Sequence, residues 1–567
     1  MTMTNRTSLV CGAAAGVLSS LVCGAAAQAE PAHHRHHRLD AAAPREDGAL
    51  KAEVAALKAQ VDAMQAWRDS QAANAAQTQA QMEQLRAQLA ETQAREQAAE
   101  AQVANQIQTI PGEVKGEVAT AVAEAAPKTD KLYIKGVSLQ FGGFVAAESV
   151  FRNHNEEADI GSSFAAIPFA NTIIGHTDET RFTARQSRIT GLIQGDASPT
   201  IHLAGYAEAD FLGAAQTANS NESNSYQPRL RVFYTTVDWD QDFGGVHLLA
   251  GQNWSLATLQ GNGITPRAEQ VPLTVDAQYV PGFTWARQPQ LRVTADLDKK
   301  VWLAVSVENP QITYSSSGQF LTGVSVVDTG AAGAEFNSVN TLSLNRVPDV
   351  IGKVALQGDV DGHALHVEAF GIYRDFYARV DTAGVSGNEG VTGGGVGGGA
   401  IFAVIPQLLD LQASGIVGDG IGRYGSAQLP DATLSVDGTI HPINEYEVLF
   451  GGTLHLGPKL DVYAYAGEEQ ERQTAFTNAT GKINNGVGNL AYNDTGCFVE
   501  AGSCSANTRT IDQGTIGFWD RPYVGAFGRL QWGIQYSYTE RHAFEGIGGA
   551  PVASENMIFT SIRYYPF

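Results

Sequence analysis

Charged side chains recur at every second position along several short runs of this sequence. Arg229 and Arg231 are two positions apart, and so are Glu208 and Asp210. In a β-strand, residues two positions apart lie on the same face of the sheet. Guanidinium groups stay charged at any working pH and can bind a carboxylate through two parallel hydrogen bonds. The spacing therefore predicts strands that turn a charged face toward water and can attract small anions.

Strand parity assigns a larger set of charged residues to one wet face, which we predict to be the lining of a pore. The basic members are Arg188, Arg229, Arg231, Arg292, Lys353, Arg374 and Arg529. The acidic members are Glu208, Asp210, Glu308, Glu368, Glu445, Glu447 and Asp461. Basic residues are denser in the first half and acids dominate after Glu445, which predicts a transverse field of the kind that sets charge selectivity in pores. The alternative is that these side chains merely solvate the interior.

Candidate catalytic and metal-binding groups are incomplete. The run 393–399 is too rich in glycine for a phosphate-binding loop and is predicted to be a flexible loop. His363 and His366 fall on opposite faces of a strand, which weakens a metal interpretation. The acidic turn 359–362 lacks the later glutamate of a calcium loop. Without a nucleophile and its base, we predict no enzyme, no cofactor and no metal.

The elements that position the charges are strands of alternating polarity. Leu303, Val305 and Val307 alternate with Ser306 and Glu308, so that one face suits lipid and the other suits water. A soluble sandwich alternates in the same way, but the connections differ. Tight turns alternate with long polar loops, as in outer-membrane barrels. The predicted long loops are 212–228, 311–348, 377–397, 418–443 and 469–512.

These patterns predict an all-β transmembrane barrel of about sixteen antiparallel strands over 131–567, in which the pair around 399–405 and 409–417 is the weakest. A barrel of this size encloses water. The net charge of −22 argues against nucleic acid as a partner.

The first 130 residues have a different composition. Residues 1–29 carry a basic start, an apolar run and a small-residue cleavage site, as in a signal peptide. Residues 30–47 contain a His/Arg cluster and are predicted to form a disordered tether. Residues 48–110 repeat apolar residues every seven positions and predict an α-helical coiled coil in the periplasm. An Ala-rich solvated single helix is the alternative. Residues 111–130 are predicted to be a linker.

Two cysteines remain after the predicted cleavage, Cys497 and Cys504, in a polar segment. In an exported protein this pair predicts a small-loop disulfide, with two free thiols as the alternative.

Three stretches resemble the DcaP-like trimeric porin family of Gram-negative bacteria: residues 249–255, residues 418–424 and the ending 562–567. The order of signal, coiled coil and barrel is similar too. The resemblance implies a homotrimer of sixteen-stranded barrels that passes small, often anionic solutes.

The predicted function is that of an outer-membrane porin, a passive diffusion channel for small hydrophilic and dicarboxylate-like solutes. The expected partners are these solutes, outer-membrane lipid, the barrel-assembly machinery and further copies of the chain. A trimeric surface adhesin with a barrel anchor is the alternative, and a barrel enzyme with catalytic residues in its wall is a second one.

The final residue carries the first testable prediction. The last strand resembles the sorting and assembly signal of bacterial outer-membrane barrels, and it must pair with the first strand because unpaired backbone groups are not tolerated in hydrocarbon. Replacing Phe567 by Asp should therefore leave unfolded protein in the periplasm. The measurement is the amount of heat-modifiable barrel in outer-membrane fractions, and normal levels in the variant would contradict the prediction.

Overall fold

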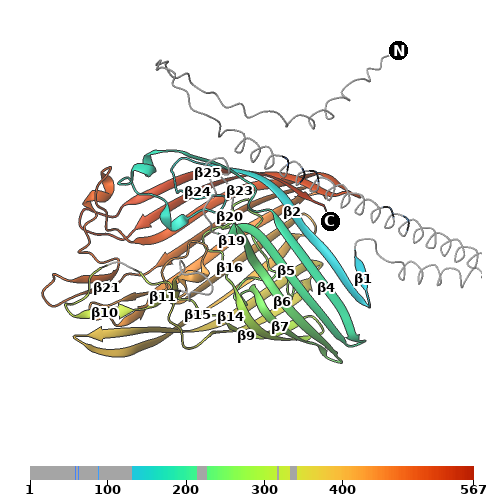
Figure 1. The fold of residues 1–567 in the computed structure, drawn as a ribbon, viewed down its shortest axis with the longest axis horizontal. Helices are drawn as coiled ribbons and strands as arrows, with labels where there is room; N and C mark the ends of the chain where they lie inside the picture. The colour runs from blue at the N-terminus through green and yellow to red at the C-terminus, as the bar shows by residue number, and fades with distance from the viewer. Residues whose placement is uncertain are drawn as a thin grey trace, which may run out of the picture. The chain divides into compact units, whose positions relative to one another are not determined.

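A closed antiparallel sheet dominates the computed structural model (Figure 1). The structure describes residues 131–566 except 214–226, 316–317 and 332–340, together with Lys58, Asp62, Gln65, Glu83 and Ala87. These five isolated positions have helical backbone, but the coiled coil stays a prediction. No helix among the described residues is long and apolar enough to cross a membrane.

The barrel wall has sixteen strands in sequence order, as predicted, with one of them interrupted. The interrupted strand consists of β3 and β4. The wall comprises β2 (Val137–Arg152), β3 (Glu179–Thr183), β4 (Arg188–Ser198), β5 (Ile201–Gly213), β6 (Gln227–Gln241), β7 (Gly244–Trp254), β8 (Arg287–Leu297), β9 (Val301–Glu308), β13 (Asp349–Val360), β14 (His363–Thr382), β15 (Val385–Ile405), β16 (Leu409–Asp419), β19 (Asn444–Leu456), β20 (Leu460–Glu471), β23 (Thr508–Gly525), β24 (Gly528–Ala543) and β25 (Val552–Tyr565).

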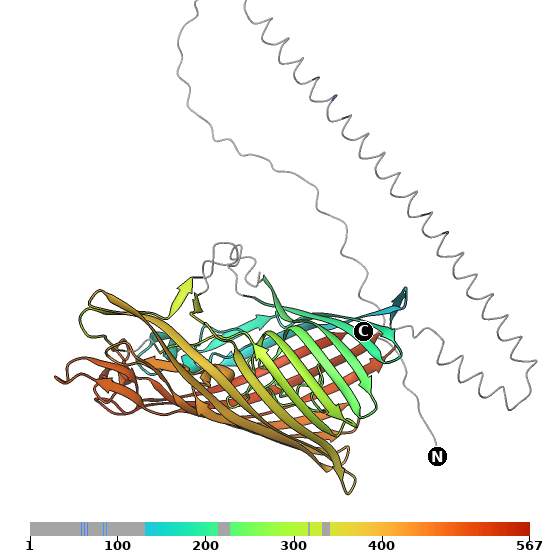
Figure 2. The same cartoon turned by 90° about the horizontal axis from the view of Figure 1, so that it is seen from below.

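Closure comes from β2. Its second half pairs with β25, from Val145 opposite Tyr564 to Arg152 opposite Met557, and its other edge pairs with β3 and β4. The strands slant around the barrel and meet without a free edge between first and last (Figure 2). Every wall strand therefore has a neighbour on both sides, which is the condition for a sheet in lipid.

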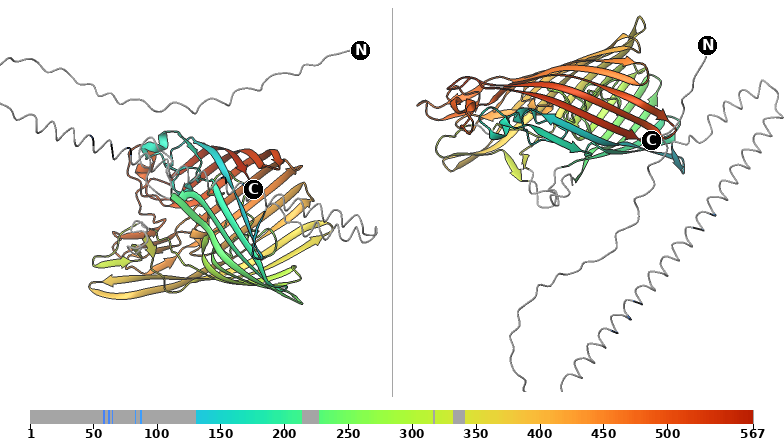
Figure 3. Two further views of the ribbon diagram at one scale, coloured as in Figure 1. Left: turned by 45° about the vertical axis from the view of Figure 1, so that its right-hand side comes forward. Right: turned by 90° about the horizontal axis from the view of Figure 1, so that it is seen from above.

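Short turns gather at one end of the barrel and long connections at the other (Figure 3). We call these the turn side and the loop side. The long connections carry small elements of their own. The strands in these connections are β10 (Val324–Val327), β11 (Thr329–Ala331), β12 (Thr341–Ser343), β17 (Ala432–Leu434), β18 (Ile440–Pro442), β21 (Thr474–Thr477) and β22 (Asn484–Val487). They also contain four 3₁₀ turns, η1 (Phe164–Ala166), η2 (Ile173–His176), η3 (Gly422–Tyr424) and η4 (Thr495–Phe498). On the turn side, the short strand β1 (Leu132–Ile134) pairs with the start of β2.

The polarity of the wall is inverted relative to a water-soluble protein. On β24, Ile534 and Tyr536 are 39% and 42% exposed, whereas Gln535 and Ser537 are fully buried. The other wall strands repeat this pattern, with large apolar side chains outside and polar ones inside. An apolar outer surface of this extent suits hydrocarbon rather than water.

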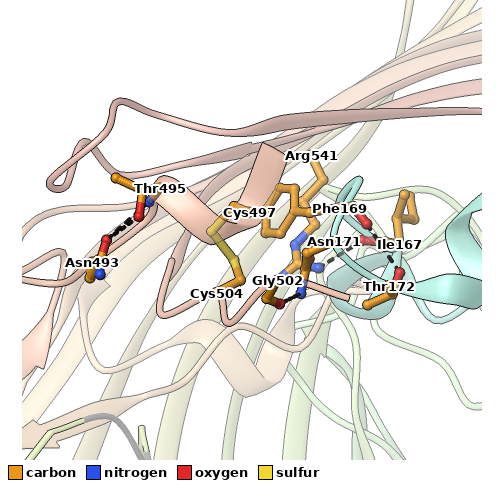
Figure 4. Close-up of a disulfide and its surroundings, with 10 residues drawn as sticks. All are labelled: Ile167, Phe169, Asn171, Thr172, Asn493, Thr495, Cys497, Gly502, Cys504 and Arg541. Carbon is orange, nitrogen blue, oxygen red and sulfur yellow. Dashed lines mark hydrogen bonds between the residues drawn. A yellow bond between two sulfur atoms is a disulfide. The ribbon is translucent and has the colours of Figure 1, made fainter. Parts of the chain in front are cut away.

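A disulfide closes a small ring within the connection between β22 and β23, on the loop side (Figure 4). Cys497 and Cys504 are bonded, with their Cα atoms 4.5 Å apart. Next to them the Asn171 side chain donates to the Gly502 carbonyl at 3.2 Å, and the Ala501 amide donates to the Asn171 carbonyl at 2.8 Å. The connection between β22 and β23 is thereby held against the connection between β2 and β3.

The prediction of a long loop over 377–397 is wrong, and so is the prediction of a flexible loop at 393–399. Strand β14 continues to Thr382, β15 begins at Val385, and a two-residue turn joins them at Ala383 and Gly384, whose φ values are 55° and 87°. Glycine-rich segments usually make weak strands. Here the inward-facing glycines of β15 leave room for neighbouring aromatic rings. A Cβ atom on Gly397 would lie 2.5 Å from Cζ of Phe370.

This packing generates a second prediction. Replacing Gly397 by Val should force the Phe370 ring out of place and cost about 1–3 kcal/mol, as overpacking does. Gly352 is the matched control, because nothing lies within 4 Å of a Cβ placed there. The measurement is the temperature at which the folded band disappears in a heat-modifiability gel. Equal temperatures for Gly397→Val and Gly352→Val would contradict the packing explanation.

Candidate functional site: the interior of the barrel

The connection between β7 and β8 folds into the barrel, and we call residues 255–286 the inward segment. Its neck is closed by a hydrogen bond from the Ser255 amide to the Ala286 carbonyl at 2.8 Å. Its middle reaches the opposite wall, where the Trp519 indole donates to the Leu273 carbonyl at 2.7 Å. The Leu273 amide donates to the Tyr465 hydroxyl at 3.2 Å. Strands β20 and β23 are thus linked across the lumen to β7 and β8.

Acidic side chains of the wall hold the inward segment. Near its start, the amides of Leu256 and Gln260 donate to Glu308 at 2.8 Å and to Glu368 at 3.1 Å. The Lys353 ammonium bridges Glu368 at 2.6 Å and the carbonyl of Thr258 at 2.8 Å. A carboxylate that accepts backbone N–H groups is a strong, charge-assisted anchor. Glu308, Lys353 and Glu368, which are predicted to line the pore, therefore lie on the inward face but bind the inward segment.

Arg292 and Arg374 also point inward and are buried by other parts of the chain. The Arg292 guanidinium donates to the Trp254 carbonyl at 2.6 Å, at the neck of the inward segment. Arg374 is 1% exposed and forms ion pairs with Asp349 at 3.3 Å and with Asp431. Arg374 thus ties the connection between β16 and β19 to the wall, whereas Arg292 joins wall strands β7 and β8 at the neck.

Among the cavities lined by described residues, two border the inward segment, one on each side of it. The turn-side cavity is about 380 Å³ and contains the predicted residues Arg188, Arg231 and Arg529, together with Arg521 and Arg563. The loop-side cavity is about 430 Å³ and contains Arg229, Arg287 and Arg423. Arginine is the only charged residue type in the lining of the second cavity, and Asp276 is the one acid in the lining of the first, among the residues that the structure describes.

The acids Glu208 and Asp210 lie on the same wall as the arginines. Arg229 binds Asp210 with two hydrogen bonds of 3.0 and 2.7 Å, and Arg231 bridges Asp210 at 3.0 Å to Glu208. Arg188 approaches Glu208 at 3.4 Å. These contacts hold the guanidiniums side by side in fixed positions along the wall.

Arg287 adds a cation that strand parity does not predict. Its guanidinium lies 5.1 Å from the ring centres of both Trp254 and Trp285. It has no carboxylate within ion-pair distance among the described residues, and its Nη1 atom has no hydrogen-bond partner there. Four guanidiniums, those of Arg188, Arg229, Arg231 and Arg287, thus share two carboxylates, which leaves this wall positive.

Two titratable groups of the inward segment report on its electrostatic surroundings. Burial disfavours ionisation of Tyr279, yet the nearby Arg231, Arg287 and Arg188 guanidiniums bring its pKa below the ordinary value. Burial raises the pKa of Asp276 to about 6. Below that pH the turn-side cavity loses its one acidic charge among the described lining residues and becomes more positive.

The remaining predicted residues occupy varied positions. Arg529 lies over the Tyr565 ring at 4.0 Å, at the turn-side mouth. Asp461 binds His455 at 2.7 Å and also binds Arg521. Phe567 lies outside the described residues.

On the outer face, Asp512, Glu540 and His542 bring three possible ligand atoms within 4.8 Å of one another, and His542 contacts both acids at 3.3 Å.

Known structures share this architecture. The outer membrane channel DcaP of Acinetobacter baumannii superposes with a TM-score of 0.51 and 18% identity, over 76% of this chain and 99% of that one. The barrel has the fold of an outer-membrane channel. At the level of the fold, the predicted resemblance to DcaP-like porins is confirmed. No family model and no curated protein matches the sequence.

Two further structures are more distant. Outer-membrane expressed OmpT of Vibrio cholerae shares 10% identity over 77% of this chain and 99% of that one, with a TM-score of 0.39. The anion-selective porin from Comamonas acidovorans shares 11% identity over 76% and 99%, also at 0.39. Likenesses at this level support no conclusion about the solute.

Proposed function

We propose that the chain is a porin of the Gram-negative outer membrane, through which small hydrophilic solutes diffuse passively and anions pass preferentially. The observation that carries the proposal is the arginine wall, formed by Arg188, Arg229, Arg231 and Arg287, which borders a cavity on each side of the inward segment. Small dicarboxylates suit this wall, because adjacent guanidiniums can each bind one carboxylate through two hydrogen bonds.

The arginine wall acts through permeation rate rather than tight binding. In a water-filled pore, charges are screened over about 8–10 Å at physiological salt. The arginine wall therefore attracts an anion across the width of a cavity. Because the screened attraction is weak, the anion is not held tightly and moves on through the pore. Arg287 is the strongest candidate for this role, because no described carboxylate neutralises it and the two indoles fix its position.

The localisation and assembly are part of the same proposal. A cleaved signal peptide over 1–29 delivers the chain to the periplasm, and the loop side with its disulfide faces the exterior. The 48–110 coiled coil joins three copies in the periplasm. The inverted polarity of the wall supports the membrane location, and the heptads support self-association.

Charge selectivity is testable with purified protein in planar bilayers. Replacing Arg287 by Ser should lower the anion-to-cation permeability ratio by about 2-fold, because the wall loses its unpaired charge. Replacing Arg231 by Ser should lower it further, since Glu208 and Asp210 then lose a shared partner. The measurement is the reversal potential under a salt gradient.

Arg509, exposed on the outer face of β23, is the matched control. Its replacement by Ser should leave the ratio unchanged. A ratio that stays constant in the Arg287 and Arg231 variants would mean that the arginine wall does not set the preference of the pore. Arg292→Ser is expected to loosen the neck of the inward segment instead, because that residue is buried.

Assembly gives a separate prediction. Deleting 48–106 should weaken the oligomer, because the apolar heptad positions that associate the copies are lost. Deleting 30–47 is the control and should have no effect. The measurement is the mass of the detergent complex by light scattering. An unchanged mass, monomeric or oligomeric, with and without residues 48–106 would contradict the prediction.

A further inference from the structure

Four glutamates face one another on the inward side of β19 and β20. Glu445 lies directly opposite Glu471, and Glu447 lies directly opposite Glu469, in the register of the two strands. Each of the four is at most 2% exposed. Like charges in directly opposed positions destabilise a sheet, so this arrangement requires an explanation. We call the two couples the carboxylate pairs.

One pair holds the far end of the inward segment. The Gly282 amide donates to Glu469 at 2.7 Å, and the Thr284 hydroxyl donates to Glu447 at 2.8 Å. The Ala427 amide also donates to Glu469, at 3.0 and 3.1 Å to its two oxygens. The segment between Thr284 and the β8 strand carries Trp285, which fixes Arg287.

Four of the other carboxylate oxygens in these pairs have no hydrogen-bond partner in the part of the chain that the structure describes. Both oxygens of Glu445, one of Glu447 and one of Glu471 are buried without a hydrogen bond among the described residues. Glycines crowd against them, since a Cβ on Gly422 would lie 2.6 Å from Oε2 of Glu445. Burying a full negative charge without a partner is costly.

No described cation neutralises the carboxylate pairs. Arg374 is the nearest to Glu445, but it binds Asp431, which itself faces Glu445 and Glu447. Arg541 lines the same loop-side hollow as Glu471, together with Tyr314, and binds the Ile167 carbonyl. The flanking strands contribute the opposed residues Ile416, Gly418 and Ile511, none of which titrates.

Two carboxylates that share one buried site cannot both ionise cheaply, and such couples hold one proton between them. A single proton in each pair removes the cross-strand repulsion and leaves one negative charge. In the Glu447–Glu469 pair the charged member is best placed as Glu469, because it accepts hydrogen bonds from two backbone amides, those of Gly282 and Ala427.

We propose that Glu447 and Glu469 are positioning residues of the pore, and that the proton shared by this pair fixes the inward segment against β19 and β20. The inference rests on the proposed function, since it assumes passage past this segment. Loss of the second proton at alkaline pH places two charges opposite each other and releases the segment around Gly282 and Thr284. Tyr279 and Trp285 then lose their fixed positions beside the arginine wall.

Single-channel recording tests the proposal. The unaltered protein should give steady current at neutral pH and current fluctuations about 3-fold larger at alkaline pH, where the shared proton is lost. Glu447→Gln keeps an oxygen for Thr284 but cannot ionise, so it should abolish the alkaline increase. Glu540→Gln, on the outer face, is the matched control and should keep the profile of the unaltered protein.

A second variant guards against failure of Glu447→Gln to fold, which heat-modifiability would reveal. Thr284→Val leaves both pairs intact and removes one contact, so fluctuations should already be present at neutral pH. The same alkaline increase in Glu447→Gln as in the unaltered protein would overturn the proposal, and so would a profile that follows added calcium instead of pH. Absence of any current from the folded, unaltered protein would refute the proposed function instead.

Discussion

The structure depends on one constraint: each backbone N–H and C=O group within the hydrocarbon must have a partner inside the protein. Pairing of β2 with β25 meets this constraint for the two strands that would otherwise be edges. Once the sheet is closed, side chains can be apolar outside and polar inside. The wall can bury glutamines, serines and arginines only because these side chains find hydrogen-bond partners in the interior, in polar groups of the inward-folded chain and in water.

The inward segment is the second consequence of closure. A sixteen-stranded wall encloses more space than its own side chains can fill, and residues 255–286 occupy part of this space, with a described cavity on each side of them. Backbone amides of the segment need acceptors, and the wall supplies carboxylates. Acids that strand parity assigns to the pore lining, such as Glu308 and Glu368, therefore anchor the inward segment. The arginines of β4 and β6 border the cavities on either side of it.

Alternation of polarity made the wall predictable. The strand count and the turns followed from it, and the same rule pointed the side chains of Arg188, Arg229 and Arg231 to the cavities. It could not predict the inward segment, which has no alternation. It also missed Arg287, because strict alternation places this position on the outer face with Pro289 and Leu291, opposite to Gln288 and Arg292. The glycines of β15 were misread because their strand depends on Phe370 and Phe376, which come from a neighbouring strand and not from local sequence.

The hydrogen bond between Ser255 and Ala286 joins the two ends of the inward segment where it leaves β7 and returns to β8. Strands β7 and β8 keep their register up to the point where the segment leaves the wall, from Gly244 opposite Leu297 to Trp254 opposite Arg287. The width of the pore, which the inward segment sets, can therefore be changed without changing the barrel wall. A shorter or differently charged segment could be grafted between the same two residues, which would make this barrel a scaffold for nanopores of chosen bore.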